Sequence, residues 1–323
     1  RDRSPSRGLG DVYKRQVLAG GPSVGITQDR FPIDWDAVET ESMEYFLTLL
    51  RTDTSNPPGN ETDAAMYLQE VLGQEDITAD LYALEPSRAN LVARIRGNGS
   101  KQPLLVMGHT DVVGVQRENW SVDPFGAVIK DGYIYGRGAL DDKDNVTAAL
   151  MVMLLLKRTE VDLDRDVIFL AEAGEEGTTA FGVDYMVENH WGEIAAEYCL
   201  AEGGGAVARD GEVKVMAIAT TEKFPMRVRL VAHGTAGHGS IPRVDNAVSA
   251  LATAIGRLAA WQTPLRLNET TIAYFNRLAD ISPPEQAARY EGILDPAQQA
   301  RIEHYFAENE PVSYTHLTLP TKA

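Results

Sequence analysis

The chain has 323 residues, of which 44% are hydrophobic and 24% charged, and this composition is typical of a folded globular protein. The net charge of −17 argues against nucleic acid or an anionic membrane as a partner, and no apolar run reaches the roughly 20 residues that span a bilayer. A single cysteine, Cys199, excludes an internal disulfide and a cysteine-rich zinc site.

The two ends of the chain differ from the rest. Residues 1–16 are basic, and neither they nor residues 312–323 show a helix or strand period; both resemble translated sequencing-adapter DNA. We therefore expect both segments to be non-native and the gene to be cut at both ends. The stretch 17-VLAGGPSVG-25 is either the tail of a signal peptide or a linker. Localisation stays open between the cytoplasm and the periplasm or secretion.

The first part of the chain alternates predicted helices and strands. Apolar spacing predicts helices, one of them almost wholly apolar in its middle, and continuous apolar runs predict buried strands. The helices are expected at 36–51, 61–73 and 141–158, and the strands at 89–97, 103–109, 166–172 and 197–202. This alternation predicts an α/β layer with a largely parallel sheet.

The pattern changes after about residue 213. Strands are predicted at 213–221 and 226–234, followed by helices at 246–261 and within 283–309. Strands followed by helices, without the spacing of a βαβ unit, indicate a smaller α+β domain. We therefore predict a catalytic domain over 17–220 and a small domain over 221–311.

Acids and histidines follow the predicted strands of the first domain. The stretches are 108-GHTD-111, 172-EAGEE-176 and 201-AEGGG-205, and Asp141 and Asp142 open the long helix. Ligands of open α/β sheets bind beyond the carboxyl ends of the strands, so these side chains are expected at one edge. The adjacent acids at 175 and 176 repel each other unless a cation neutralises them. Zinc takes histidine and carboxylate ligands, and two zinc ions can share a bridging carboxylate.

Five stretches in order resemble one family. They are 108-GHTDVV-113, 120-WSVDPFGAVIKDGYIYGRGALDDK-143, 170-LAEAGEEG-177, 200-LAEGGG-205 and 234-GTAGHGSIP-242. The sequence is similar to the zinc aminoacylase, carboxypeptidase and succinyl-diaminopimelate desuccinylase metallopeptidases, above all to the branch of yeast carboxypeptidase S. The resemblance implies an α/β zinc exopeptidase domain of the phosphorylase/hydrolase-like type, with a mostly parallel sheet flanked by helices. It also implies an inserted α+β domain that forms a homodimer.

The resemblance implies a metal-binding set of two zinc ions, with cobalt or manganese as possible substitutes. His109 and Glu202 would bind one zinc, Glu176 would bind the other, and Asp141 would bridge them. Asp111 would orient the imidazole of the histidine. Asp142 is left with the role of capping the long helix.

The resemblance also implies the catalytic roles and the substrate. Glu175 would be the general base that takes a proton from the attacking water and passes it to the leaving amine, and His238 would stabilise the oxyanion. The expected reaction is hydrolysis of an amide bond next to a free carboxylate, in an N-acyl amino acid or a short peptide.

Each residue also has a structural interpretation. His109 alone would be a hydrogen-bonded structural residue, the acids at 175 and 176 would be solvated, and Glu202 would only mark a turn. His238 would be a loop histidine, and His233 is its rival for the catalytic role. The order of the five motifs favours the metal interpretation.

The sequence departs from the family in one respect. The family has a second metal-binding histidine near its C-terminus, on a segment that returns to the catalytic sheet, and no such segment is visible here. We therefore expect a fragment that is inactive or nearly so. The alternative function is a degenerate, non-catalytic member that binds ligand or dimerises; another zinc exopeptidase without a small domain is a third possibility, against which the stretch at 234–242 speaks.

Overall fold

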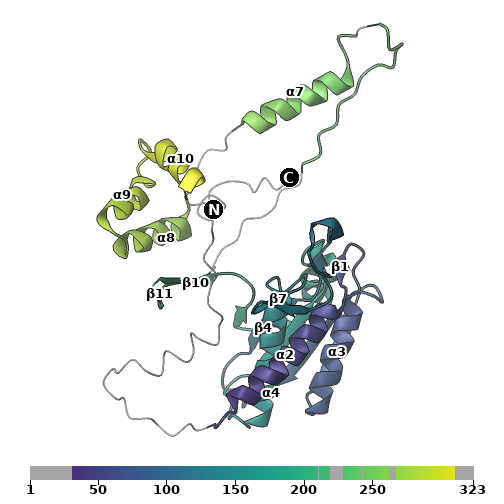
Figure 1. Cartoon of the computed structure of the whole chain (residues 1–323), viewed down its shortest axis with the longest axis vertical. Coiled ribbons are helices and arrows are strands. Elements are labelled where there is room, and N and C mark those ends of the chain that lie inside the picture. The colour runs from purple at the N-terminus through teal and green to yellow at the C-terminus, as the bar shows by residue number, and fades with distance from the viewer. Residues whose placement is uncertain (1–30, 210, 219–227, 242, 262–266, 310–323) are drawn as a thin grey trace. The chain divides into compact units, whose positions relative to one another are not determined.

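The computed structural model describes residues 31–209, 211–218, 228–241, 243–261 and 267–309. The chain divides into two units between Met216 and Ala217, and each unit is considered by itself (Figure 1).

The predictions for residues 1–16, 17–25 and 312–323 lie outside the described residues. The division between a catalytic domain over 17–220 and a small domain over 221–311 stays a prediction.

A five-stranded mixed sheet forms the centre of the first unit. Its spatial order is β2 (Ala79–Ala83), β3 (Ala89–Ile95), β8 (Val167–Glu172), β4 (Leu104–His109) and β9 (Tyr198–Leu200). Strand β3 is antiparallel to both of its neighbours, whereas β8, β4 and β9 run parallel to one another. The predicted α/β class is confirmed, and the strands predicted for this sheet are all present. The edge strand β2 was not predicted.

Three helices lie side by side over one face of this sheet, as Figure 1 shows: α2 (Trp35–Arg51), α3 (Glu61–Gln74) and α4 (Lys143–Arg158). Their apolar side chains pack with those of β3 and β8 into the larger core, in which Leu150 and Phe169 are completely buried. Burial of these apolar faces supplies the main driving force for the unit to fold. All three helices agree with the sequence prediction.

Strand β8 is buried on both faces because its side chains alternate between two cores. Phe169 points into the core under α2, α3 and α4. Ile168 and Leu170 point to the opposite face, where they pack under α5 (Val183–Asn189) and α6 (Trp191–Ile194). A strand covered on both faces needs a continuous apolar run, which is the pattern this segment has.

Short elements connect these layers. Strand β1 pairs in parallel with β5, and β6 forms an antiparallel hairpin with β7. A further two-stranded sheet joins β10 to β11. The bounds are β1 (Ser55–Asn56), β5 (Val112–Val113), β6 (Val128–Lys130), β7 (Tyr133–Tyr135), β10 (Gly205–Arg209), β11 (Glu212–Ala217), and the 3-10 turns η1 (Arg117–Asn119) and η2 (Thr179–Phe181).

The parallel pairing of β4 with β8 brings chemically active side chains to one edge of the sheet. The register opposes His109 to Glu172, and each is the last residue of its strand. The loops that follow therefore leave the sheet at neighbouring points. This is the arrangement that the sequence predicts for the stretches 108–111 and 172–176.

The start of α4 is held at this edge by a buried lysine. Lys143 is completely buried, and its ammonium donates hydrogen bonds to the backbone oxygens of Leu49, at 2.9 Å, and Thr52, at 2.8 Å. Both oxygens belong to the C-terminal end of α2, where the carbonyl groups lack helical partners and attract a positive charge. The beginning of one helix is thereby fixed against the end of another.

The described part of the second unit is helical. Helices α8 (Glu269–Asp280), α9 (Pro284–Gly292) and α10 (Gln299–Asn309) surround a small core that includes Phe275 and Tyr290. The helical prediction for 283–309 is confirmed, although a turn divides that segment into two helices, and α8 was not predicted.

The other predictions for this part have mixed outcomes. The helix predicted at 246–261 is present as α7 (Ala247–Ala260). Residues 228–234 form no strand, contrary to the prediction, and no described segment pairs with them. A strand without a pairing partner leaves its backbone N–H and C=O groups without hydrogen bonds. An alternation of apolar and polar residues is therefore not enough to specify a strand. Throughout the described ranges, no helix is both long enough and apolar enough to cross a membrane.

A buried ion pair joins α3 to β3. The guanidinium of Arg88 binds both carboxylate oxygens of Glu61, at 2.5 and 2.6 Å, and both side chains are almost completely excluded from solvent. The same guanidinium donates to the backbone oxygen of Pro58 at 3.0 Å and lies 4.4 Å from the ring centre of Phe181. One arginine therefore connects the chain before α3 with the loop after β8.

We predict that Arg88→Ala lowers the free energy of unfolding by about 3–5 kcal/mol, because it leaves the carboxylate of Glu61 buried without its partner. Urea unfolding followed by circular dichroism measures this loss. The control is Lys101→Ala, which breaks the exposed pair with Asp164 and should leave stability nearly unchanged. Equal effects of the two substitutions would contradict the prediction.

Candidate metal centre

His109 ends strand β4, and its side chain is only 2% exposed. Its Nδ1 atom lies 3.0 Å from the backbone oxygen of Asp111 and 3.4 Å from the carboxylate oxygen Oδ1 of the same residue. Both oxygens are acceptors, so they favour a proton on Nδ1 and, in the neutral imidazole, leave the lone pair of Nε2 for a metal. Both the main-chain oxygen and the carboxylate of Asp111 thus lie beside Nδ1, and the orienting role of Asp111 stays a prediction.

Three carboxylates surround the Nε2 atom of this imidazole. Oδ1 of Asp141 lies at 3.0 Å, Oε2 of Glu202 at 3.4 Å and Oε2 of Glu175 at 4.0 Å. They come from three separate segments: the start of α4, the loop after β9 and the loop after β8. The structure therefore brings together four of the residues that the sequence predicted for the site.

Asp111 is completely buried and organises the loop after β8. Its Oδ1 accepts the backbone N–H of Glu175 at 3.0 Å, and its Oδ2 accepts the backbone N–H of Glu176 at 3.1 Å. Oδ2 also accepts a hydrogen bond from the side-chain amide of Asn56 at 2.7 Å. Burial alone would raise the pKa of this carboxyl, but the hydrogen bonds from His109, Asn56 and the N–H of Glu176 lower it below its usual value.

Asp142 does not have the role that the sequence assigned to it. It occupies the N-cap position of α4, but its side chain accepts no hydrogen bond from the backbone N–H groups of that helix. Instead its Oδ2 accepts the backbone N–H of His109 at 3.2 Å, and its Oδ1 accepts a short hydrogen bond from the amide of Asn145. The capping prediction is wrong because the buried side chain faces strand β4 rather than the free N–H groups of α4.

Asp142 instead belongs to the metal-capable group of this site. One ligand atom each from His109, Asp142 and Glu202 lie within 4.8 Å of one another. The bridging position was assigned to Asp141, whose carboxylate touches Nε2 but whose side chain is 58% exposed. Both neighbouring aspartates therefore contact the same histidine: Asp142 accepts its main-chain N–H, and Asp141 contacts its ring.

The charges around the imidazole perturb its proton affinity. Burial would lower the pKa of His109, but its hydrogen bond with Asp111 and the charges of Asp111, Asp142 and Glu175 raise that pKa to about 10. Among the described residues of this cluster, the imidazolium of His109 supplies positive charge. A divalent metal would replace that proton and balance the carboxylates in its stead.

Two carboxyl groups of the cluster hold their protons more tightly than usual. Burial, together with the charges of Asp142 and Asp141, raises the pKa of Glu202 to about 7. Burial, followed by the charge of Asp141, also raises the pKa of Glu176. Burial is the larger cause in both cases, and repulsion from the neighbouring acids adds to it.

Glu172 is a residue of this site to which the sequence interpretation gave no role. It ends β8, is 6% exposed, and its Oε2 atom has no hydrogen-bond partner among the described residues. Burial, with repulsion from Glu175 and Asp111, raises its pKa to about 7. An acid that closes a wholly apolar strand was the available signal for a buried carboxyl.

His238 belongs to the second unit. Its Nδ1 atom lies 2.8 Å from the hydroxyl of Ser240, and the side chain is exposed, as is that of its rival His233 in neighbouring sequence. The oxyanion-stabilising role of His238 stays a prediction.

Comparison with known families identifies the chain. The sequence profile of peptidase family M20/M25/M40 matches residues 105–319, which is more than half of the sequence. The chain belongs to this family. This confirms the resemblance inferred from the five motifs. It also confirms the predicted class of enzyme, a hydrolase.

Individual relatives agree with this membership. The chain is 34% identical over 193 residues to human N-fatty-acyl-amino acid synthase/hydrolase PM20D1, covering 57% of this chain and 38% of that protein. It is 31% identical over 216 residues to a probable succinyl-diaminopimelate desuccinylase of Staphylococcus aureus strain Mu50, covering 66% of this chain and 50% of that protein. The chain thus spans half or less of the length of these relatives.

Among solved structures, an M20 family metallo-carboxypeptidase from Sulfolobus solfataricus is 27% identical, with a TM-score of 0.46, covering 51% of this chain and 38% of that chain.

The residues of this M20 site suit a divalent metal. The available atoms are one imidazole nitrogen and several carboxylate oxygens, which are the donors that zinc, manganese and cobalt accept. The imidazole is already held through Nδ1, and the acids beside it have raised pKa values that a cation would lower. Donor chemistry, orientation and charge therefore agree.

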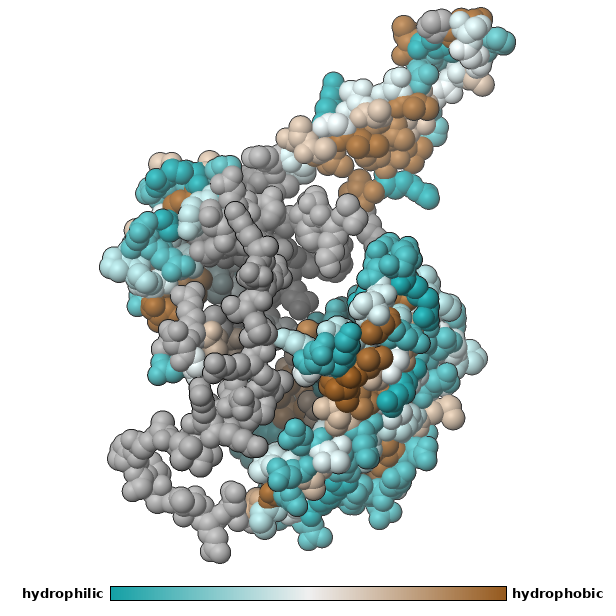
Figure 2. Space-filling view, in the orientation of Figure 1, coloured by the Kyte–Doolittle hydropathy of each residue, from teal (hydrophilic) through white to brown (hydrophobic). Residues whose placement is uncertain are grey.

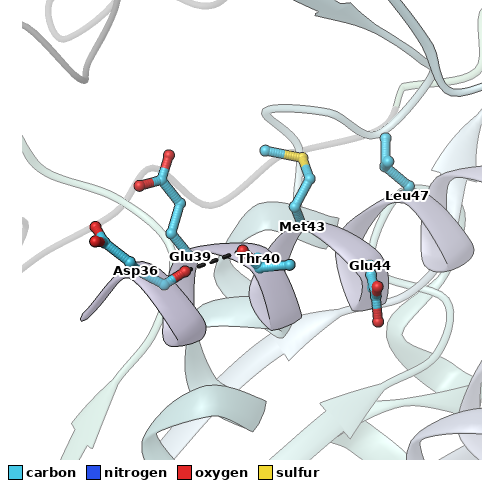
Figure 3. A pocket seen from close by; sticks show the side chains of 6 residues that line it. All are labelled: Asp36, Glu39, Thr40, Met43, Glu44 and Leu47. Carbon is cyan, nitrogen blue, oxygen red and sulfur yellow. Dashed lines mark hydrogen bonds between the residues drawn. The ribbon is translucent and has the colours of Figure 1, made fainter. Parts of the chain in front are cut away.

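A cavity of about 500 Å³ lies elsewhere, along one face of α2. Figure 3 shows its lining side chains, all from that one helix: Asp36, Glu39, Thr40, Met43, Glu44 and Leu47. It contains carboxylates but no histidine, and none of the residues around Nε2 of His109. We assign it no metal.

We predict that saturating zinc stabilises the folded chain by about 2.7 kcal/mol at 100 times its Kd, and that His109→Ala abolishes this gain. Differential scanning fluorimetry with and without zinc measures the melting temperature of each variant. The control is Glu39→Ala, which removes a carboxylate of the α2 cavity and should keep the zinc effect. A zinc-induced rise that survives in His109→Ala would rule out the site described above.

Proposed function

We propose that the chain carries the metal-binding part of a hydrolase that cleaves an amide bond next to a free carboxylate, in an N-acyl amino acid or a short peptide. The observation that supports this most strongly is the cluster around Nε2 of His109, where carboxylates from three segments lie at 3.0 to 4.0 Å. Such a cluster is electrostatically unfavourable without a cation, because its members repel one another.

The proposed cofactor is a pair of zinc ions, with cobalt or manganese as possible substitutes. His109 and Glu202 would hold the first ion and Glu176 the second, with Asp141 between them; the contact of Asp142 with this group makes it a further candidate. When bound, such ions polarise the amide carbonyl and lower the pKa of water.

Glu175 is the proposed general base. Its backbone N–H is anchored by Asp111, while its side chain is 47% exposed and reaches within 4.0 Å of the imidazole of His109. A fixed main chain with a solvent-facing carboxylate suits a group that collects a proton from water and delivers it to the leaving amine. His238 is proposed to stabilise the oxyanion.

The substrate class is supported by the names of two relatives. Both names, N-fatty-acyl-amino acid synthase/hydrolase and succinyl-diaminopimelate desuccinylase, describe acylated amino compounds. We propose an N-acyl amino acid or a short peptide for this chain.

We further propose that turnover by the chain as given is slow. The metal-capable group found among the described residues contains one histidine, so a second metal would depend on carboxylates alone. A turnover of about 1 per second or faster by the purified chain would contradict this part of the proposal.

We predict that Glu175→Gln lowers the rate of hydrolysis of N-acetyl amino acids at least about 100-fold, because the amide cannot carry the proton. Zinc affinity should be largely retained. Product release in long incubations, measured by chromatography, detects slow turnover, and zinc titration is run on the same samples. The control is Glu188→Gln on the exposed side of α5. A rate that survives Glu175→Gln would reject the base, and zinc binding without any hydrolysis would favour the non-catalytic alternative.

We also propose that the second unit forms a homodimer. Helix α7 leaves apolar side chains exposed, among them Val248 at 77% and Ile255 and Leu258 at 50% each. Figure 2 shows a brown, hydrophobic area at the position that α7 has in Figure 1. Exposed apolar surface of this kind is typical of an interaction site.

Val248→Asp is expected to weaken a dimer formed through α7 by at least about tenfold in Kd, since it buries an unpaired charge in the contact. Sedimentation equilibrium measures the association. Ser249→Ala, on the same helix, is the control and should leave the Kd unchanged. A monomeric wild-type chain at all concentrations would refute the proposed dimer.

A further inference from the structure

We propose that Asn56 is a positioning residue of the metal centre, which holds the carboxylate of Asp111 and, through it, both His109 and the loop that carries Glu175 and Glu176. The inference deepens the proposed function and rests on the metal centre proposed there. Asn56 lies more than 50 residues before Asp111 in the sequence and is not among the residues that the five motifs point to.

The side-chain amide of Asn56 has one well-defined partner. The side chain is 8% exposed, and its Nδ2 atom donates to Oδ2 of Asp111 at 2.7 Å. A buried carboxylate only accepts hydrogen bonds, so the NH₂ group of the amide, and not its oxygen, has to face Asp111. The role therefore requires a donor at this position and not merely a polar side chain.

The position of Asn56 is fixed independently of that bond. Strand β1 pairs with β5, which opposes Asn56 to Val113. One residue before β1, the hydroxyl of Thr54 donates to the backbone oxygen of Thr110 at 2.6 Å, and the backbone oxygen of Thr54 accepts the N–H of Val112 at 3.2 Å. The main chain around Asn56 is thus attached to the segment that contains Asp111 before the side chains interact.

Asn56 also contacts the acid-bearing loop directly. A Cβ atom added to Gly177 would lie 2.6 Å from Nδ2 and 2.7 Å from Oδ1 of Asn56, closer than packed atoms allow. The backbone of the loop after Glu176 therefore rests against the amide group. Only a glycine permits this approach, and it leaves Asn56 between Asp111 on one side and the loop on the other.

These contacts make Asp111 a junction of three segments. Its two oxygens accept from Asn56 and from the N–H groups of Glu175 and Glu176, and its Oδ1 lies 3.4 Å from Nδ1 of His109. Loss of the Asn56 donor would leave a buried carboxylate short of one partner and free to turn toward water. The imidazole of His109 and the loop that carries Glu175 and Glu176 would then no longer be held by the same carboxylate.

A purely space-filling role for Asn56 makes a different prediction, and two substitutions separate the two roles. Asn56→Leu keeps the branched shape of the side chain and removes the donor, whereas Asn56→Ala removes both. If the amide only fills space, the leucine variant should behave like the wild type. If it positions Asp111, both variants should lose zinc affinity, by about tenfold each, as is typical when a residue that orients a metal ligand is removed.

The experiment uses the full chain and zinc alone as the probe. Zinc affinity is measured by competition with a chromogenic chelator, and the cobalt(II) absorption spectrum reports the geometry of the site in the folded molecules. The control is Ser55→Ala, a neighbour whose hydroxyl donates to Asp53 and to no site residue that the structure describes, and which should bind zinc as the wild type does. Where turnover is measurable, the positioning role predicts a lower kcat with an unchanged KM.

The outcomes decide the inference separately from the proposed function. Wild-type zinc affinity in Asn56→Leu would overturn it. If the two apolar variants fail to fold, wild-type affinity in Asn56→Asp, whose ionised carboxylate has no donor, would overturn it as well. If the wild-type chain itself binds no zinc, the proposed metal centre fails. Crystal structures of the metal-free wild type and Asn56→Ala then decide: a rotated Asp111 carboxylate supports the positioning role, and an unmoved one overturns it.

Discussion

The repulsion among carboxylates around one buried imidazole is the constraint on which this site depends. Carboxylates from three segments lie within 4.0 Å of Nε2 of His109, and two of the surrounding acids, Glu176 and Glu202, have raised pKa values. Such an arrangement costs free energy unless a positive charge is present. In the chain alone that charge is the imidazolium, and a divalent metal would take its place. The proposed hydrolase function depends on this replacement of the imidazole proton by a metal ion.

The fold opposes the repulsion by fixing the main chain rather than the acidic side chains. Strands β4 and β8 end side by side, so the loops after them start from neighbouring points. Asp111 then anchors the N–H groups of Glu175 and Glu176, and the buried ammonium of Lys143 holds the start of α4 against the end of α2. The acids thereby lie close together although their charges repel, because hydrogen bonds that do not involve the acidic side chains hold the backbone in place. Their side chains stay partly exposed and able to bind.

Much of the fold could be predicted from the sequence because, in the first unit, the pattern of apolar residues matches the faces that the elements bury. The apolar run of β8 occurs where the strand is covered on both faces, and the apolar side of α4 packs into the larger core. Strand β2 was missed because it lies at the sheet edge with only two partly buried residues in its centre, and the strand expected at 226–234 does not form in the described residues 228–234. The hydrophobic pattern of a sequence predicts buried elements better than it predicts strands that depend on a pairing partner.

The site was predictable to the extent that its residues follow strands. His109, Asp111, Glu175 and Glu202 were predicted in this way; the structure brings them together, and their roles stay a proposal. Asp142 was misassigned because its sequence position at the start of a helix is that of a cap, whereas the direction of its side chain is set by tertiary contacts. Asn56 escaped notice because a turn-rich stretch was read only as the end of a helix, and its partner lies far away in sequence.

The measurement that tests this account most directly is anomalous X-ray diffraction from crystals of the chain soaked in zinc. The account predicts an anomalous peak about 2.0–2.2 Å from Nε2 of His109, with carboxylate oxygens of the surrounding acids completing its coordination. A peak that lies only at other acids, such as those of the α2 cavity, or no peak beside His109 at saturating zinc, would contradict it.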